Sequence, residues 1–198
     1  MALQLADQDG LEELSMLTLA RRLDCGVMTI YGYVDNKEDL LDAIALRGLA
    51  EVHLPRPLPG EPRAVLMGWG RALRLTLLHH PSLPMMFLSR AVIGPGMFQG
   101  LEALLGALSG AGVSATFGVH AIYAVAIYAA GFVAWELPRT RRQPESAYAA
   151  AWRREFASLP QEDFPHTASV LEELPRVAGE QQFELGLTAL VDGLLEAA

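Results

Sequence analysis

The stretch that decides the fold is SMLTLARRLDCGVMTIYGYVDNKEDLLDAI, residues 15–44. Its apolar residues recur every three to four positions, first over 16–23 and again over 27–34, which is the spacing of an amphipathic helix. Asp24-Cys25-Gly26 interrupts this pattern, and Asp35 or Asn36 can cap a third helix that follows. Two short helices joined by a tight turn predict a helix-turn-helix.

The second helix of such a unit enters the major groove of DNA, which is wide enough to admit one. We expect Cys25, Ile30 and Val34 to face the scaffold. The outer face would then carry residues able to approach bases and phosphates, namely Val27, Met28, Thr29, Tyr31 and Tyr33. Lys37 would add a positive charge beside backbone amides that favour phosphate. On spacing alone, a helical hairpin that binds nothing explains the pattern about as well.

The rest of the chain predicts a larger helical domain. Residues 54–62, LPRPLPGEP, contain four prolines and one glycine, so we place a boundary there between domains at 1–53 and 61–198. Helical periodicity continues over 62–79, 84–93, 97–109, 114–137, 145–157 and 180–196, and no useful alternating pattern predicts strands. The expected fold class is all-α. The segments near 114–137 and 180–196 are more apolar than a one-sided surface helix needs, which predicts a homodimer interface.

Composition places the chain in the cytoplasm. Cys25 is the single cysteine, so no intramolecular disulfide can form, and the first ten residues do not resemble a signal peptide. The segment 114–137 is long enough to span a membrane, but it contains Ser114, Thr116 and His120, and we therefore expect a soluble core helix and no membrane partner. The first 50 residues carry four basic and nine acidic side chains. This balance argues against DNA binding, because DNA-binding domains usually present a basic face.

Apolar and aromatic residues of the larger domain could line a pocket for a small lipophilic effector: Trp69, Met86, Phe87, Tyr123, Ile127, Tyr128 and Phe132. Arg90 and His120 could orient such a ligand. Ordinary core packing is the alternative role for each of these residues. No catalytic motif and no ligand set with recognisable metal-binding spacing is present in the sequence, so we expect neither an enzyme nor a metal or cofactor.

Residues 17–44, LTLARRLDCGVMTIYGYVDNKEDLLDAI, resemble the DNA-binding motif of the TetR family of bacterial transcription repressors. The family pattern L-A-x-x-L-G-V-x-x-x-x-L-Y-x-H-[VF]-x-[ND]-K-x-x-L is matched by Leu19, Ala20, Leu23, Ile30, Tyr31, Val34, Asn36, Lys37, Leu40 and Leu41. Residues 183–197, FELGLTALVDGLLEA, resemble the last helix of the tetracycline-repressor-like subgroup, which has a drug-binding core.

The resemblance implies base-facing roles for Val27 and Met28 and phosphate-facing roles for Thr29, Tyr31, Tyr33 and Lys37. It also implies a homodimer through the segments near 114–137 and 180–196, whose two recognition helices read a palindromic operator. His80 falls near a drug-contacting histidine of the subgroup, whereas Ile127 takes the place of a metal-binding histidine and cannot bind a metal.

Departures from the family pattern are Leu17, where many members have a basic residue, Asp24 in place of the turn glycine, and Tyr33 in place of histidine. Family members usually begin with ten or more additional residues rich in Arg and Lys, so we expect a basic arm to be missing here. The sequence therefore predicts a dimeric repressor that a small lipophilic effector releases from its operator. The alternative is a helical dimer that binds a small molecule or protein without binding DNA.

Overall fold

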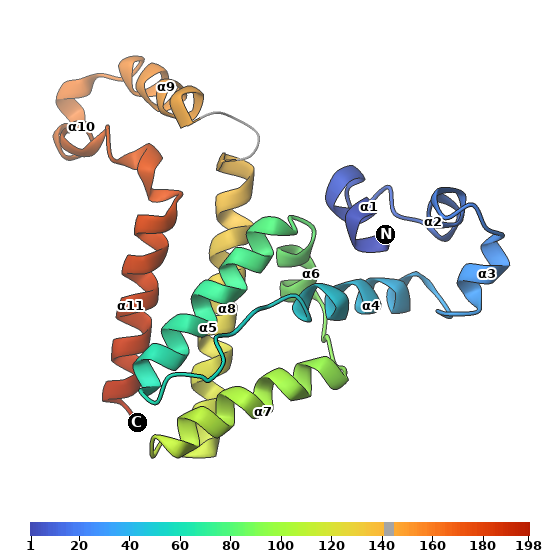
Figure 1. The fold of residues 1–198 in the computed structure, drawn as a ribbon. Helices are drawn as coiled ribbons and strands as arrows, with labels where there is room; N and C mark the ends of the chain where they lie inside the picture. The colour runs from blue at the N-terminus through green and yellow to red at the C-terminus, as the bar shows by residue number, and fades with distance from the viewer. Residues whose placement is uncertain (141–144) are drawn as a thin grey trace.

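The computed structural model describes residues 1–140 and 145–198, and those residues form helices and no strand (Figure 1). The α-helices are α1 Ala2–Asp9, α2 Met16–Arg22, α3 Val27–Tyr31, α4 Lys37–Leu49, α5 Pro62–His79, α6 Leu83–Ser89, α7 Pro95–Gly110, α8 Ala115–Thr140, α9 Glu145–Ala157, α10 Pro165–Val170 and α11 Glu180–Glu196. Two short 3₁₀ helices, η1 Gln161–Asp163 and η2 Leu174–Val177, flank α10. The all-α prediction is confirmed.

Local sequence explains the helix-turn-helix formed by α2 and α3. The Ser15 hydroxyl accepts a hydrogen bond from the Thr18 amide at 3.0 Å and begins α2, and the Asn36 side chain accepts one from the Asp39 amide at 2.9 Å and begins α4. Asp24, where the family has glycine, adopts a left-handed φ of 51°. Aspartate tolerates this conformation better than most residues, so the turn survives the replacement.

Three long helices, α5, α8 and α11, lie side by side and form the body of the molecule, with α7 crossing one end (Figure 1). Their facing sides bury Leu66, Leu73, Val125, Val133, Phe183 and Leu187 almost completely. α8 is long and apolar enough to cross a membrane by composition, but its buried face makes it the central core helix of this fold. Gly70 lets α5 approach its neighbours, since an added Cβ would lie 2.8 Å from Leu187.

The N-terminal helices join the body mainly through α4 and α6. α4 packs against α5, α6 and α7, and α6 packs on its other side against α8. Residues 50–61 link α4 to α5 without forming a helix. α6 therefore lies between the helix that carries the helix-turn-helix and the central helix of the body.

Two features differ from the expected helix boundaries. The helix expected over 84–93 already ends at Ser89, because the backbone of Arg90 turns extended and the Arg90 side chain reaches α4. The short helix α10 was not predicted, and it buries none of its side chains. It therefore has no apolar stripe that a periodicity search could detect.

Candidate DNA-binding and effector-binding surfaces

The helix α3 is held to its domain by one face and exposed on the other. Ile30 is buried, while 76% of Met28 and 86% of Tyr33 are accessible to solvent. Thr29 and Tyr31 are also exposed, as is Lys37 at the first position of α4. Val27 differs from the other expected contact residues because it is half-buried and packs partly against the domain core.

Acidic side chains neutralise part of the positive charge near α3. Arg22 at the end of α2 forms an ion pair with Asp9 of α1, with 3.3 Å between Nη2 and Oδ2. The first turn of α4 carries Glu38 and Asp39 directly after Lys37. Neutral hydroxyl groups of Thr29 and Tyr31 on α3, and of Tyr33 two residues after it, are therefore a large part of what this surface offers to phosphate oxygens.

In the body, an aromatic cluster joins α8 to α11. The ring of Phe132 lies 5.9 Å from Tyr128, 5.9 Å from Trp135 and 5.4 Å from Phe183, measured between centroids. The Tyr128 hydroxyl donates a hydrogen bond to the Phe183 carbonyl at 2.9 Å, and burial raises the pKa of Tyr128. Of the expected effector contacts, the structure thus brings Tyr128 and Phe132 together, and it adds Phe183 of α11 to them.

A buried ion pair adjoins this cluster. Arg74 of α5 binds Glu136 of α8, with 2.7 Å between Nη2 and Oε1 and 3.3 Å between Nε and Oε2. The Arg74 guanidinium also lies 4.9 Å from the centroid of the Phe183 ring. This pair was not predicted from the sequence, although the position of Arg74 near Leu73 and Leu77 on an apolar helix face was an available signal.

The other expected effector contacts are dispersed. The Trp69 indole donates to the Ile122 carbonyl at 3.1 Å and so ties α5 to α8. Met86 is buried in α6 and Phe87 is half-buried beside it. His120, Tyr123 and Ile127 lie on an exposed stripe of α8, away from the aromatic cluster's buried Phe183.

Two further expected contacts, His80 and Arg90, lie at the junction between the body and the N-terminal helices, not beside the aromatic cluster. His80 hydrogen-bonds to Asp7 and Glu51, and Arg90 donates to Asp42 at 2.7 Å. Both contacts cross from the body to helices of the DNA-binding unit.

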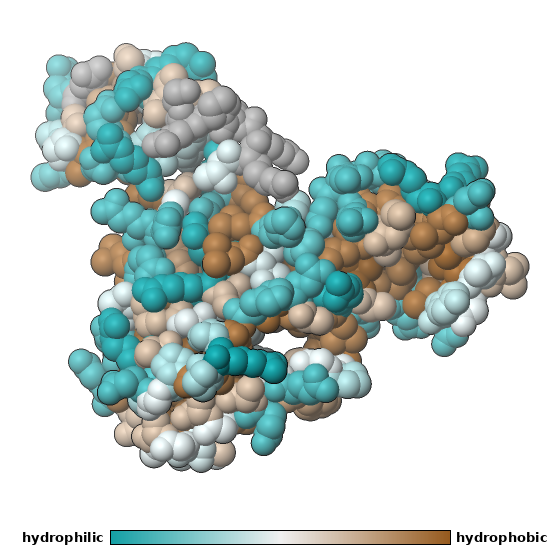
Figure 2. Space-filling view, viewed as in Figure 1, coloured by the Kyte–Doolittle hydropathy of each residue, from teal (hydrophilic) through white to brown (hydrophobic). Residues whose placement is uncertain are grey.

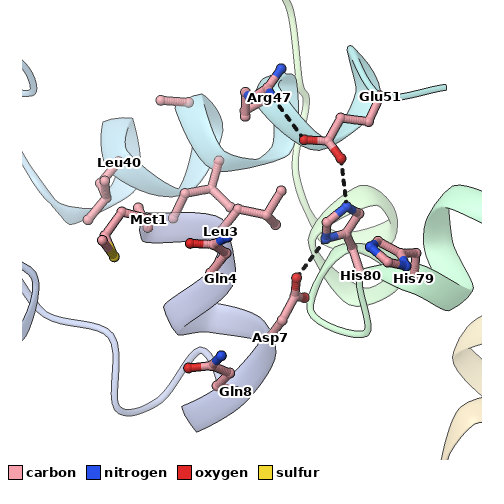
Figure 3. Close-up of a pocket in the computed structure, with 13 residues that line it drawn as sticks. Met1, Leu3, Gln4, Asp7, Gln8, Leu40, Arg47, Glu51, His79 and His80 are labelled. Atoms are coloured by element: carbon pink, nitrogen blue, oxygen red, sulfur yellow. Dashed lines mark hydrogen bonds and ion pairs between the residues drawn. The ribbon is translucent and has the colours of Figure 1, made fainter.

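Two cavities flank α4. One, of about 600 Å³, lies between α1, α4 and His79-His80 and is drawn in Figure 3. The other, of about 370 Å³, lies between Tyr33 and Leu46. In the described part of the chain, no group of three or more His, Cys, Asp or Glu side chains is arranged to hold a metal ion.

Sequence comparisons agree with this architecture. Residues 1–44 match the profile of bacterial regulatory proteins of the tetR family, and residues 54–198 match that of the tetracyclin repressor-like C-terminal domain. An HTH-type transcriptional regulator of Saccharopolyspora erythraea is 31% identical over 199 residues, which cover 100% of this chain and 82% of that protein. The HTH-type transcriptional repressor DrrR1 of Streptomyces coeruleorubidus is 30% identical over 200 residues, or 98% of this chain and 74% of DrrR1.

A solved structure shares the whole fold. The TetR family protein ActR of Streptomyces coelicolor, crystallised in complex with actinorhodin, superposes with a TM-score of 0.85 at 28% identity, covering 100% of this chain and 92% of ActR. Both family profiles match consecutive parts of the chain, and together they cover nearly all of it. The chain therefore belongs to the TetR family of bacterial regulatory proteins and is a DNA-binding transcriptional regulator, not an enzyme.

Proposed function

We propose that this chain represses transcription as a homodimer that binds a palindromic operator through α3 and leaves it when a small lipophilic effector binds the body. The observation that carries the proposal is the exposed outer face of α3, which Ile30 holds against a packed scaffold. Met28 on this face and Tyr33, two residues after α3, are accessible to a DNA surface. The relative DrrR1 is described as a repressor, which favours repression over activation for this chain.

The proposed dimer interface consists of exposed residues on α8 and α11. Ile127 is 61% exposed on α8, and Leu185 is 65% exposed on α11. Tyr123 and His120 extend the α8 stripe, while the small residue Ala189 follows Leu185 one turn later on α11. In the view of Figure 2, apolar residues form small separate patches on the body and a larger area over the N-terminal helices. Pairing α8 and α11 of two copies would bury these stripes in a four-helix bundle.

The proposed effector site centres on the aromatic cluster of Tyr128, Phe132, Trp135 and Phe183. Aromatic faces favour a planar apolar ligand, and Arg74 and Glu136 offer polar groups beside it. ActR, which shares the fold, was crystallised with actinorhodin, so that compound is a suitable first probe. Cytoplasmic location and release of DNA by such a compound are parts of this proposal.

Transmission from the body to DNA would run through α6. Because α6 packs against α8 on one side and α4 on the other, a shift of α8 displaces α4, which carries α3. A change in the distance between the two recognition helices of a dimer would prevent both from entering successive major grooves. The effector would act by favouring that second spacing.

Titration with actinorhodin tests the effector part. We expect quenching of tryptophan fluorescence that is much reduced in Trp135→Phe, because Trp135 belongs to the cluster, but retained in Trp152→Phe, whose ring lies on α9. Light scattering tests the dimer. A monomer in light scattering would contradict the proposed interface. Quenching that Trp135→Phe and Trp152→Phe keep equally would contradict the proposed effector site.

One observation favours the alternative of a dimer that binds no DNA. The first 50 residues carry four basic and nine acidic groups, and the Arg22 side chain is engaged by Asp9. A domain of this charge gains little from counterion release. Absence of salt-sensitive DNA binding together with intact dimerisation and ligand binding would establish this alternative.

A further inference from the structure

His80 lies between two carboxylates from two separate segments of the DNA-binding unit. It directly follows α5, and only 7% of it is exposed. Its Nδ1 lies 2.6 Å from Asp7 Oδ2 of α1, and its Nε2 lies 3.0 Å from Glu51 Oε2 just after α4. Figure 3 shows the imidazole bridging the two acids at the edge of the larger cavity.

Neighbouring donors fix the orientation of both carboxylates. The other oxygen of Asp7 accepts hydrogen bonds from the Ser82 amide at 3.1 Å and the Ser82 hydroxyl at 2.7 Å. The other oxygen of Glu51 lies 3.1 Å from Arg47 Nη2. Each acid is therefore held with one oxygen facing His80.

This geometry requires two donors on one imidazole. A neutral imidazole has one N–H and one lone pair, so one of its nitrogens would direct a lone pair at a carboxylate oxygen. Only the doubly protonated imidazolium satisfies both acids. The link between His80, Asp7 and Glu51, termed the histidine latch below, is therefore complete only when His80 carries a proton on each nitrogen.

The charges around His80 support its protonation. Burial lowers the pKa of His80, but the hydrogen bonds to Asp7 and Glu51 and the charges of these acids outweigh burial, and the pKa is raised above its ordinary value near 6.5. The hydrogen bond from His80 lowers the pKa of Glu51 below its ordinary value near 4.5. The other titratable groups facing the latch are Arg47 of α4, His79, whose ring centroid lies 4.8 Å away, and His53, whose ring contacts the Glu51 carbonyl.

A second polar link joins the other end of α6 to α4. Arg90 donates from Nε to Asp42 at 2.7 Å and from Nη2 to the Glu38 carbonyl at 2.9 Å, and it also pairs with the Glu38 carboxylate. The guanidinium keeps its charge at all physiological pH values. The helix α6 is thus tied to the DNA-binding unit at both ends, and of the two cations only His80 can lose its charge as pH rises above its ordinary pKa near 6.5.

We propose that the histidine latch is a proton-dependent device that docks α1 and the end of α4 onto the body, and that its opening at alkaline pH loosens the DNA-binding unit at one end of α6. The direction of this pH dependence follows from the linkage between protonation and stability. The latch contributes fully below pH 6.5 and is lost as pH rises through the raised pKa of His80, whereas the Arg90 link persists. A cell interior that becomes more alkaline would weaken the mechanical coupling of the body to α4.

Two measurements on the full chain without DNA test the latch. Nitrogen-15 NMR of the histidine side chains, with His80 assigned by His80→Gln, should show an imidazolium that titrates above pH 6.5. Hydrogen exchange, expressed as protection factors, should show α1 losing about tenfold or more of its protection across the same titration. Exchange of α11 serves as the internal reference, since its main contacts are with α5, α8 and η2 and not with α1 or α4.

Two variants separate a proton-dependent role from a merely structural one. Asp7→Asn keeps an acceptor for Ser82 but removes a charge from His80, so the midpoint of the α1 transition should move to lower pH. Asp42→Asn weakens the Arg90 link instead and should leave that midpoint unchanged. A neutral His80 at pH 6, or α1 protection that is independent of pH, would overturn the proposal.

The functional consequence rests on the proposed function and is measured separately. Where operator binding is established, the effector concentration needed for half release should rise with pH in the native chain and stay constant in His80→Gln. A chain that binds no DNA would contradict the proposed function and leave the exchange and NMR results to decide the latch on their own.

Discussion

Replacing Gly48 by alanine tests whether α4 and α6 must approach as closely as the structure shows. Gly48 is buried in α4, and an added Cβ would lie 2.2 Å from Leu83 Cδ1, 2.8 Å from Cδ2 and 3.0 Å from Cγ. Leu83 begins α6 and is only 2% exposed, so its side chain has no solvent-filled space to move into. The substitution therefore forces either an unfavourable rotamer of Leu83 or a displacement of α6.

Two opposing terms set the change in the free energy of unfolding. Alanine stabilises a helix interior by about 1 kcal/mol relative to glycine. Overpacking a filled core costs typically about 1–3 kcal/mol, and here the clash involves the branched end of Leu83 rather than one terminal atom. The difference between the two terms is a loss of up to about 2 kcal/mol in the free energy of unfolding of Gly48→Ala.

Urea unfolding followed by circular dichroism measures this difference. Gly68→Ala is the matched control, because Gly68 also lies within a long helix but its added Cβ would meet no atom within 4 Å. This control should gain stability, by up to about 1 kcal/mol. Leu83→Ala removes the clashing atoms, so adding Gly48→Ala to that variant should cost nothing further.

A Gly48→Ala chain as stable as the Gly68→Ala chain would refute this reasoning. Additive effects of Gly48→Ala and Leu83→Ala would refute it as well, because residues in direct conflict must couple. Either result would show that the separation of α4 and α6 is not set at this contact.

Three further predictions concern the DNA-facing helix, the buried ion pair and the dimer. Tyr33→Ala should weaken binding to all DNA sequences alike without changing the melting temperature, since Tyr33 is exposed and is expected to contact phosphate. Glu136→Ala should lower the free energy of unfolding by about 3–5 kcal/mol, because Arg74 is then left buried without its partner. Its control is Asp192→Asn, which weakens the exposed ion pair with Arg63 and should change the free energy of unfolding little in the same urea experiment. Ile127→Arg should yield a helical monomer in light scattering, and a persistent dimer would argue against the α8 interface.

Local signals in the sequence were sufficient for the helix-turn-helix. The sequence predicts a cap at Asp35 or Asn36 because capping depends on a few neighbouring residues, and the structure has it at Asn36. The inward position of Ile30 followed from periodicity alone. Asp24 shows the limit of this approach, since its left-handed conformation depends on the turn it must complete.

Long-range pairings could not be predicted in this way. His80 meets Asp7 across 73 residues, and Arg74 meets Glu136 across 62, so no local pattern records either contact. In the sequence, both Arg74 and His80 have leucines close by, and that setting alone suits a pocket, a core or a domain junction. Only the packing of α4, α5 and α6 places His80 at the junction, beside Asp7 and Glu51. The drug contact that the family resemblance implies for His80 stays a prediction.

The central claim is that α3 reads DNA in an effector-dependent way. Fluorescence anisotropy of labelled DNA from the region upstream of the chain's own gene, compared with a scrambled sequence at two salt concentrations, tests it most directly. We predict salt-sensitive binding that prefers the native DNA, is weakened by Tyr33→Ala and is reversed by a ligand of the aromatic cluster. Equal binding to both DNAs, or binding to neither, would contradict the claim.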